Sequence, residues 1–199
     1  DLVFIVPSDH LIDPGEIFFE SLEKAKLAAL GPHLITFGIR PRKAETGYGY
    51  IQIGGPFDAS TYKIKKFTEK PSQEIADQYV LSDEYYWNSG MFLCQIGTFW
   101  DQIEKHDKDT YEVAKNDIET IIKNYHNFKD ISIDYALLEK SKDILLCPLS
   151  VRWSDIGSWD AIYDVLDKDQ EKNVTVGNVC SIDTKNCLIF GNKKMISTI

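Results

Sequence analysis

The stretch LVFIVPSDHLIDPGEIFFESLEKAKLAALGPHLITFGI, residues 2–39, decides the fold class. Residues 2–7 form a nearly continuous apolar run, which is typical of a strand buried on both faces of a parallel sheet. Residues 17–30 repeat apolar side chains at helical spacing and stop at Gly31-Pro32. A second apolar run follows at residues 33–39. Strand, helix and strand in this order predict a βαβ unit, and therefore an α/β fold.

The rest of the chain adds strands and helices to this unit. Apolar stretches predict further strands at residues 48–54, 61–70, 90–96 and 143–150. Helical spacing and capping residues predict helices at residues 72–81, 132–141 and 159–166, the last capped by Ser158, and helical segments between residues 97 and 126. From residue 173 onward, short β-like pieces are separated by the turn sequence DTKN. We expect a mixed, Rossmann-like sheet flanked by helices, with a small C-terminal β appendage.

Length and charge limit the classes of function. The chain has 199 residues, 43% of them hydrophobic, which is enough for one substantial core. A formal net charge of −9, from 31 acidic and 22 basic side chains, argues against nucleic acid as a partner. No apolar run is long enough to span a membrane, and no signal peptide is indicated, so we expect a cytoplasmic protein.

The cysteines and histidines indicate no metal or disulfide framework. The four cysteines form no C-x-x-C pair and sit in apolar stretches, which predicts reduced, buried thiols. Cys180 and Cys187 could face each other across a hairpin, but a disulfide there would be unusual in the cytosol. The four histidines lack the spacing of zinc ligands.

Two acidic residues follow predicted strands at positions where α/β folds bind ligands. Asp9 comes directly after the strand at residues 2–7, and Asp155 shortly after the strand at residues 143–150. Ligands of open α/β sheets lie beyond the carboxyl ends of the strands, so the two carboxylates could be adjacent in space. Paired carboxylates suit Mg²⁺, which usually shares its shell with water and phosphate. Each aspartate taken alone could equally be a turn or capping residue.

Three short motifs carry candidate ligand-binding residues. In FTEKP, Glu69 can accept hydrogen bonds from sugar hydroxyls and Lys70 can hold a phosphate. In ETGYGY, Gly49 is one of two glycines that allow the backbone to approach a ligand. In WNSGMF, Asn88 can both donate and accept. A solvated strand edge, a glycine hairpin without ligand and a turn asparagine are the alternatives for these motifs.

In order along the chain, seven motifs resemble one enzyme family. They are PSDHLI, GIRPRKAETGYGYI, FTEKP, WNSGMF, SIDYALLEKS, LCPLSVRWSDIGSWDAIYDV and GNVCSIDTKNCLIFGNKKMISTI. Together they are similar to mannose-1-phosphate guanylyltransferase, in the long bacterial form that is often fused to phosphomannose isomerase. The resemblance runs from Val3 to Ile199. It implies a nucleotidyltransferase that joins mannose 1-phosphate to GTP with Mg²⁺, forming GDP-mannose and releasing pyrophosphate.

The resemblance also implies roles for particular residues and a division of the chain. The metal would be held by Asp9 and Asp155, the sugar by Gly49, Glu69 and Asn88, and the sugar phosphate by Lys70, while Asp134 in SIDYA would line the pocket. Asp9, Asp155 and Lys70 would be the catalytic residues. Residues 1–170 would be the C-terminal, sugar-phosphate-binding part of the nucleotidyltransferase domain, and residues 171–199 would begin a small β-rich domain.

One departure from the family pattern shapes the expected behaviour of the chain. The family begins with a glycine-rich nucleotide loop containing RLWPLSR, and this sequence contains no such run. We therefore expect an incomplete GTP site, little turnover by the chain alone, and a bared sheet edge that favours a homo-oligomer. The alternatives are another sugar-1-phosphate nucleotidyltransferase and a non-catalytic binding or assembly module.

Overall fold

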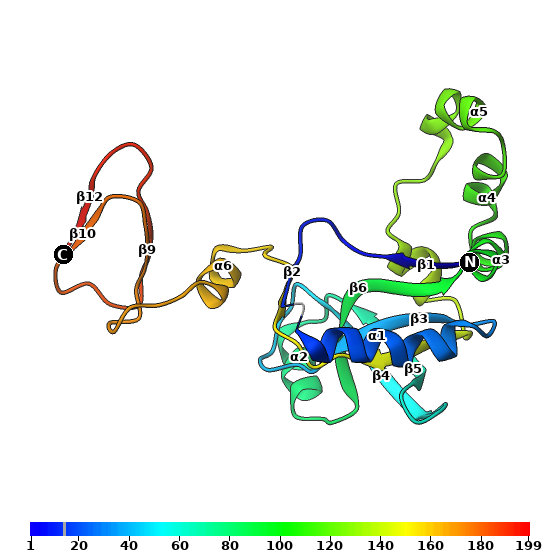
Figure 1. Cartoon of the computed structure of the whole chain (residues 1–199), viewed down its shortest axis with the longest axis horizontal. Coiled ribbons are helices and arrows are strands. Elements are labelled where there is room, and N and C mark those ends of the chain that lie inside the picture. The colour runs from blue at the N-terminus through cyan, green and yellow to red at the C-terminus, as the bar shows by residue number, and fades with distance from the viewer. Residues whose placement is uncertain (14) are drawn as a thin grey trace. The chain divides into compact units, whose positions relative to one another are not determined.

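The computed structural model describes residues 1–13 and 15–199 (Figure 1). They divide into two compact units. The first unit comprises Asp1–Ser8 and Asp13–Val151, and the second comprises Asp9–Ile12 and Arg152–Ile199. Each unit is described by itself below. The domain boundary expected near residue 170 is not tested by this division and stays a prediction.

A six-stranded mixed sheet forms the centre of the first unit, in the order β1-β6-β3-β7-β5-β4. The long strand β6 also pairs with β4. Only β3 and β7 run parallel, and the other pairs of this sheet are antiparallel. The strands are β1 (Leu2–Ile5), β3 (Leu34–Ile39), β4 (Gly49–Pro56), β5 (Tyr62–Glu69), β6 (Tyr85–Gln95) and β7 (Ile144–Pro148). The expected mixed α/β sheet is confirmed.

Strand β1 differs from the expectation of a parallel strand buried on both faces. All four of its residues are only half-buried, and it pairs antiparallel with β6 at the edge of the sheet. Because β1 and β3 are both antiparallel to β6, they run in the same direction, but β6 lies between them. The expected strand–helix–strand unit is therefore present, but its two strands do not pair directly with each other.

Helices cover both faces of the sheet. They are α1 (Glu16–Ala29), α2 (Gln73–Val80), α3 (Ile96–His106), α4 (Lys108–Ala114) and α5 (Ile118–Lys123), with a 3₁₀ turn at Tyr125–Asn127 and a π-helical turn, η2, at Asp134–Leu138. Helix α1 lies across one face (Figure 1) and buries a stripe of small residues, including Ser21 and Ala25, which permits close packing. Among the described residues, no helix has the length and apolar character that crossing a bilayer requires.

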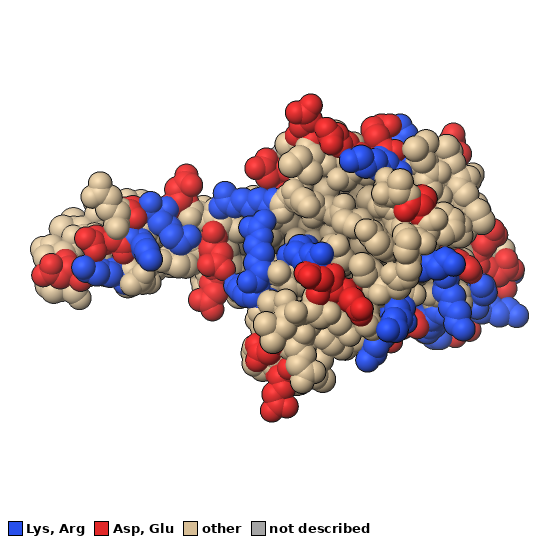
Figure 2. Space-filling view, turned by 90° about the horizontal axis from the view of Figure 1, so that it is seen from below, with Lys and Arg blue, Asp and Glu red and all other residues tan. Residues whose placement is uncertain are grey.

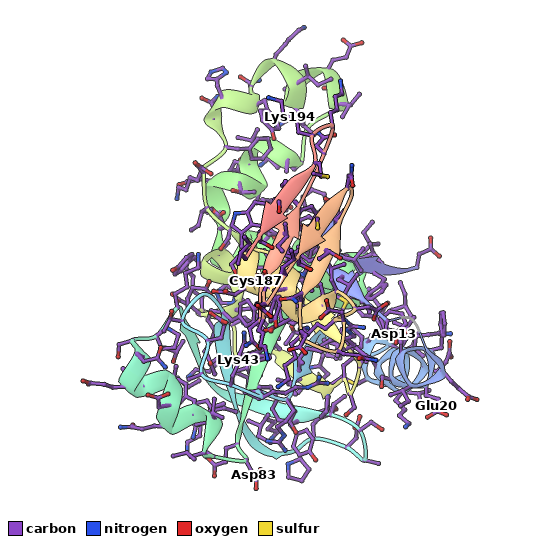
Figure 3. The ribbon with its side chains drawn as sticks, turned by 90° about the vertical axis from the view of Figure 1, so that its left-hand side faces the viewer. Asp13, Glu20, Lys43, Asp83, Cys187 and Lys194 are labelled. Atoms are coloured by element: carbon purple, nitrogen blue, oxygen red, sulfur yellow. The ribbon has the colours of Figure 1, made fainter. Side chains whose placement is uncertain are left out.

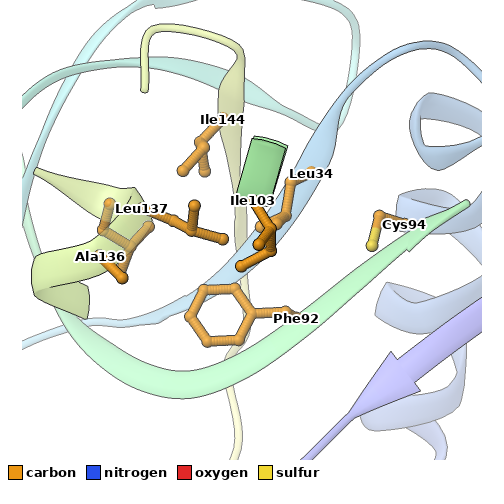
Figure 4. Packing of buried hydrophobic residues seen from close by; sticks show 8 residues of the cluster. Leu34, Phe92, Cys94, Ile103, Ala136, Leu137 and Ile144 are labelled. Carbon is orange, nitrogen blue, oxygen red and sulfur yellow. The ribbon is translucent and has the colours of Figure 1, made fainter. Parts of the chain in front are cut away.

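The opposite face of the sheet carries a core cluster that fixes η2 (Figure 4). Ala136, Leu137 and Leu138 of η2 are almost completely buried against Leu34 and Phe92 of the sheet. The sequence predicts an ordinary capped helix at residues 132–141, but the structure forms a single π-helical turn there. Such turns recur at functional sites, and this one begins at Asp134.

The second unit combines one short strand pair, one helix and a β tail. Strand β2 (Leu11–Ile12) pairs antiparallel with β8 (Trp153–Ser154). Helix α6 (Trp159–Val165) begins at Ser158, whose side chain accepts a hydrogen bond from Ala161 N at 3.1 Å, which confirms the expected cap. In the tail, β9 (Val174–Val176) pairs parallel with β11 (Leu188–Phe190), and β10 (Val179–Ser181) pairs parallel with β12 (Ile196–Thr198).

The tail corrects the expectation that all cysteines are buried. Cys94 and Cys147 are buried in the first unit, and burial raises the pKa of both thiols to about 11. Cys180 is exposed and Cys187, labelled in Figure 3, is half-buried. Short strands with one solvent-facing side cannot cover every apolar side chain. All four cysteines are unpaired.

Candidate sugar-phosphate and metal sites

Three neighbouring strands place predicted site residues in one row across the sheet. Glu69 on β5 lies opposite Gly49 on β4. Tyr50 of β4 lies opposite Trp87 of β6, so one further step along this antiparallel ladder places Gly49 beside Asn88. Residues directly opposite each other in a ladder share a face of the sheet. Glu69, Gly49 and Asn88 therefore form one row on one face.

On the same face of the sheet, the neighbouring row of residues is apolar. Ile51 lies opposite both Phe67 and Tyr86, and these side chains pack in a buried cluster. At Gly49 the space of the missing side chain is taken up by the Glu69 carboxylate and the Phe67 ring. A Cβ atom there would clash with Glu69 Oε2 and would lie 2.8 Å from Phe67 Cζ. Glycine at residue 49 is therefore needed for the Glu69 side chain to keep its position beside the strand that leads to Asn88.

Asp134 lies outside the sheet and contacts the row through Asn88. Asn88 Nδ2 donates a hydrogen bond to Asp134 Oδ1 at 2.7 Å. Asn88 Oδ1 accepts from Thr36 Oγ1 at 3.2 Å and from Gly90 N at 3.3 Å. Thr36 was not among the residues predicted from the sequence. The signal that could have found it is a single hydroxyl in the otherwise apolar strand LITFGI.

The site holds two carboxylates whose charged forms are disfavoured. Burial raises the pKa of Glu69, the nearby charge of Asp134 raises it further, and Lys70 opposes both effects. Burial likewise raises the pKa of Asp134, against the hydrogen bond from Asn88. A ligand that donates hydrogen bonds to these carboxylates would stabilise their ionised forms. Hydroxyl groups of a sugar are donors of this kind.

Lys70 directly follows strand β5 and has a strained conformation. Its φ is +46°, in the left-handed region that non-glycine residues seldom adopt. Its backbone N donates to Tyr48 O at 3.2 Å, which holds the turn against β4. Lys70 is exposed and follows directly after Glu69 of the row. Strain of this kind persists where surrounding contacts impose it, and it clusters at ligand sites.

In the second unit, the two predicted metal ligands lie at the same end of the short β2–β8 pair. Leu11 lies opposite Ser154 and Ile12 opposite Trp153. Asp9 precedes β2 and Asp155 follows β8, and in an antiparallel pair these positions lie at the same end. The sequence predicts that the two carboxylates follow two long strands. In the structure they instead flank a short strand pair that the sequence does not predict.

The turn after β8 holds the Asp155 carboxylate in place. Its Oδ1 accepts a hydrogen bond from Gly157 N at 3.0 Å. Ile156 has φ +50°, an outlier for a β-branched residue. A Cβ atom at residue 157 would lie 2.9 Å from Asp155 Oδ2, so glycine is needed for the carboxylate to lie over the turn. These contacts fix the orientation of a potential metal ligand.

Asp9 contributes an accessible carboxylate at the same end of the strand pair. Its side chain is 84% exposed, and Oδ1 lies 3.9 Å from His10 Nε2. The His10 ring packs edge-on against Trp153, with the ring centroids 5.4 Å apart. Among residues 1–13 and 15–199, no group of three or more His, Cys, Asp or Glu side chains is arranged to hold a metal. Two carboxylates nonetheless fit Mg²⁺, whose remaining ligands are usually water and phosphate.

The seven predicted site residues thus form two groups. Gly49, Glu69, Lys70, Asn88 and Asp134 belong to the first unit, and Asp9 and Asp155 to the second. Their roles stay predictions. On the face of the molecule drawn in Figure 2, basic side chains form small groups that acidic side chains separate.

Comparison with known proteins decides the family. A family model described as nucleotidyl transferase matches residues 1–172. The chain belongs to the nucleotidyl transferase family. The chain is 37% identical to the alginate biosynthesis protein AlgA of Pseudomonas aeruginosa and 33% identical to the mannose-1-phosphate guanylyltransferase of Salmonella muenchen. Both matches cover 100% of this chain but only 44% of the relative.

Two solved structures have a fold similar to that of this chain. A structure titled mannose-1-phosphate geranyltransferase, from Thermus thermophilus, matches 100% of this chain and 60% of its own, with a TM-score of 0.89 and 29% identity. A structure titled mannose-6-phosphate isomerase, from Helicobacter pylori, matches 77% of this chain and 64% of its own, with a TM-score of 0.67 and 32% identity. The expected nucleotidyltransferase fold is confirmed.

Substituting Gly49 tests whether the missing side chain shapes the row. Gly49→Ala should displace the Glu69 carboxylate, because the new Cβ would occupy its position. We expect the affinity for a sugar phosphate to fall by at least about tenfold, the loss that follows when a charged hydrogen-bonding group is displaced. Isothermal titration calorimetry measures this loss. Gly55→Ala on the same strand is the control, because a Cβ there meets no atom within 4 Å. Equal affinities of both variants would contradict this role.

Neutralising Glu69 should stabilise the ligand-free fold at neutral pH. Because folding raises its pKa, the charged form opposes folding above the folded pKa, and the opposition disappears as pH falls toward about 4.3. We expect Glu69→Gln to raise Tm by about 2–4 °C at pH 7.5 and by much less near pH 4. Calorimetry at several pH values tests this. The exposed Glu74→Gln is the control, and a pH-independent difference would contradict the assignment.

Proposed function

We propose that this chain carries the sugar-phosphate and metal-binding residues of a mannose-1-phosphate guanylyltransferase. The row of Glu69, Gly49 and Asn88, bounded by Asp134 and Lys70, is the observation that carries the proposal. The names of the relatives support the choice of mannose 1-phosphate and GTP as substrates. The chain spans less than half the length of these relatives, so the activity of the whole enzyme is part of the proposal.

The row offers complementary groups to a hexose phosphate. Glu69 and Asp134 accept hydrogen bonds from sugar hydroxyls, and Asn88 donates to a hydroxyl oxygen. Gly49 lets the Glu69 carboxylate lie close over strand β4, where it can meet the sugar. Lys70 supplies a mobile positive charge for the phosphate. Together these groups bind the sugar by its hydroxyls and leave the phosphate at the end of strand β5.

In this proposal Asp9 and Asp155 hold Mg²⁺, which the donor set and the glycine cradle at residue 157 support. A phosphate oxygen of mannose 1-phosphate attacks the α-phosphorus of GTP, and the bond to pyrophosphate breaks. Held by these two carboxylates, Mg²⁺ would supply positive charge that offsets the negative charge on the transferring phosphate. The protein residues orient the attacking phosphate, and orientation supplies a large share of the rate in such transfers. A cytoplasmic location and a homo-oligomer also remain parts of the proposal.

A ligand panel tests the substrate. Mannose 1-phosphate, glucose 1-phosphate, mannose 6-phosphate and mannose are titrated into the chain by calorimetry. We expect mannose 1-phosphate to bind best, and at least about tenfold better than mannose, because a contact with a charged phosphate is lost in mannose. Tighter binding of glucose 1-phosphate would favour a related sugar nucleotidyltransferase. Binding of none of the four ligands would overturn the proposal.

Substituting Asp155 tests the metal site separately. Mn²⁺, a paramagnetic substitute for Mg²⁺, is titrated into the chain and followed by water proton relaxation. Asp155→Asn keeps the oxygen that accepts from Gly157 N but removes the charge. Removing a residue that merely supports a metal ligand costs about 10–100-fold in affinity, so we expect a loss of at least about tenfold here. Asp160→Asn, on the exposed first turn of α6, is the control. Equal Mn²⁺ affinities would remove Asp155 from the site.

A further inference from the structure

The side-chain amide of Asn88 is held from three directions. Thr36 Oγ1 and Gly90 N both donate to Asn88 Oδ1, at 3.2 and 3.3 Å. Asp134 Oδ1 accepts from Asn88 Nδ2 at 2.7 Å. Two donors within the protein therefore face the amide oxygen, and one of the two Nδ2 hydrogens is used by Asp134.

This set of partners permits one orientation of the amide. Rotation of the amide by 180° would place its oxygen against the Asp134 carboxylate and its NH₂ group against the N–H of Gly90. Both contacts would be repulsive, and the amide oxygen would lose both of its donors. In the observed orientation, the second Nδ2 hydrogen is the group that Asn88 offers to a ligand. Asn88 can therefore donate to a ligand but cannot accept from it.

The two side-chain partners are themselves fixed by the core. Thr36 is completely buried on β3, and its hydroxyl also lies 3.3 Å from Met91 O. Asp134 begins the π-helical turn whose residues Leu137 and Leu138 are buried in the core cluster. Groups supported in this way keep their positions before a ligand arrives, and little ordering then opposes binding.

We propose that Thr36 and Asp134 are positioning residues that fix the Asn88 amide as a hydrogen-bond donor to the sugar. This inference rests on the proposed function, which places Asn88 at the sugar. It assigns the donor role to one group and selects a ligand whose atom beside Asn88 is an acceptor, such as a hydroxyl oxygen. A hydroxyl in that place can accept from Asn88 and donate to a carboxylate of the row at the same time.

Substitution of Thr36 tests the inference, because its hydroxyl can be removed at nearly constant volume. Thr36→Val should weaken the binding of mannose 1-phosphate about three- to tenfold, the equivalent of one hydrogen bond. Thr36→Ser keeps the hydroxyl and should bind within about twofold of the natural protein. Calorimetry measures the affinities, and thermal melts establish that both variants are folded.

A double-mutant cycle separates positioning from a structural effect. In the Asn88→Ala background, Thr36→Val should cause no further loss of affinity, because no amide remains to be positioned. An equal loss in both backgrounds would overturn the inference. So would a folded Thr36→Val protein that binds mannose 1-phosphate as well as the natural one.

Nuclear magnetic resonance of the ligand-free chain keeps the test independent of the substrate. The Asn88 side-chain NH₂ signals are assigned by their loss in Asn88→Ala. We expect a high order parameter for this group in the natural protein and in Thr36→Ser, and a lower one in Thr36→Val. If mannose 1-phosphate does not bind, the proposed function fails, and this measurement still decides the positioning. An order parameter that Thr36→Val leaves unchanged would overturn the inference.

Discussion

The hydrogen bond between Asn88 and Asp134 joins the sheet to the π-helical turn, and the geometry of the row of Glu69, Gly49 and Asn88 depends on it. At 2.7 Å, it is a charge-assisted contact between elements 46 residues apart in the sequence. Its two ends have different supports, since β6 pairs with three strands and η2 packs in the core cluster. The bond therefore ties a polar site at the surface of the sheet to the packed core.

The same arrangement makes the ligand-free protein less stable than its packing would allow. Burial disfavours the charged forms of Glu69 and Asp134, and the charge of Asp134 raises the pKa of Glu69 further. Lys70 offsets only part of this cost. Carboxylates that repel each other in the ligand-free protein interact strongly with a ligand that donates hydrogen bonds to them. In this site, stability in the absence of ligand and affinity for a sugar are therefore opposed.

The sequence offers candidate site residues but does not show how they meet. Motif chemistry selects Glu69 and Asn88 as candidates, because acceptors and amides at strand ends suit a hydroxylated ligand. Their alignment depends on strand register, which only the paired sheet defines. Strand β1 shows a similar limit, because an apolar run does not reveal whether its neighbours are parallel or whether it forms an edge. Thr36 was not predicted because the sequence shows a single hydroxyl in an apolar strand but not which side chain that hydroxyl contacts.

Backbone strain is a further property that local sequence conceals. Among the described residues, two of the five non-glycine residues with positive φ are Lys70 and Ile156. Lys70 is itself a predicted site residue, and Ile156 lies between Asp155 and Gly157. A left-handed conformation costs a β-branched residue about 1–2 kcal/mol, and glycine would adopt it without that cost. Isoleucine persists at residue 156 because the Ser154 hydroxyl accepts from its N–H at 3.1 Å and Gly157 N binds the carboxylate, so that the turn is determined from both sides. The same turn therefore strains the backbone of Ile156 and fixes the carboxylate of Asp155.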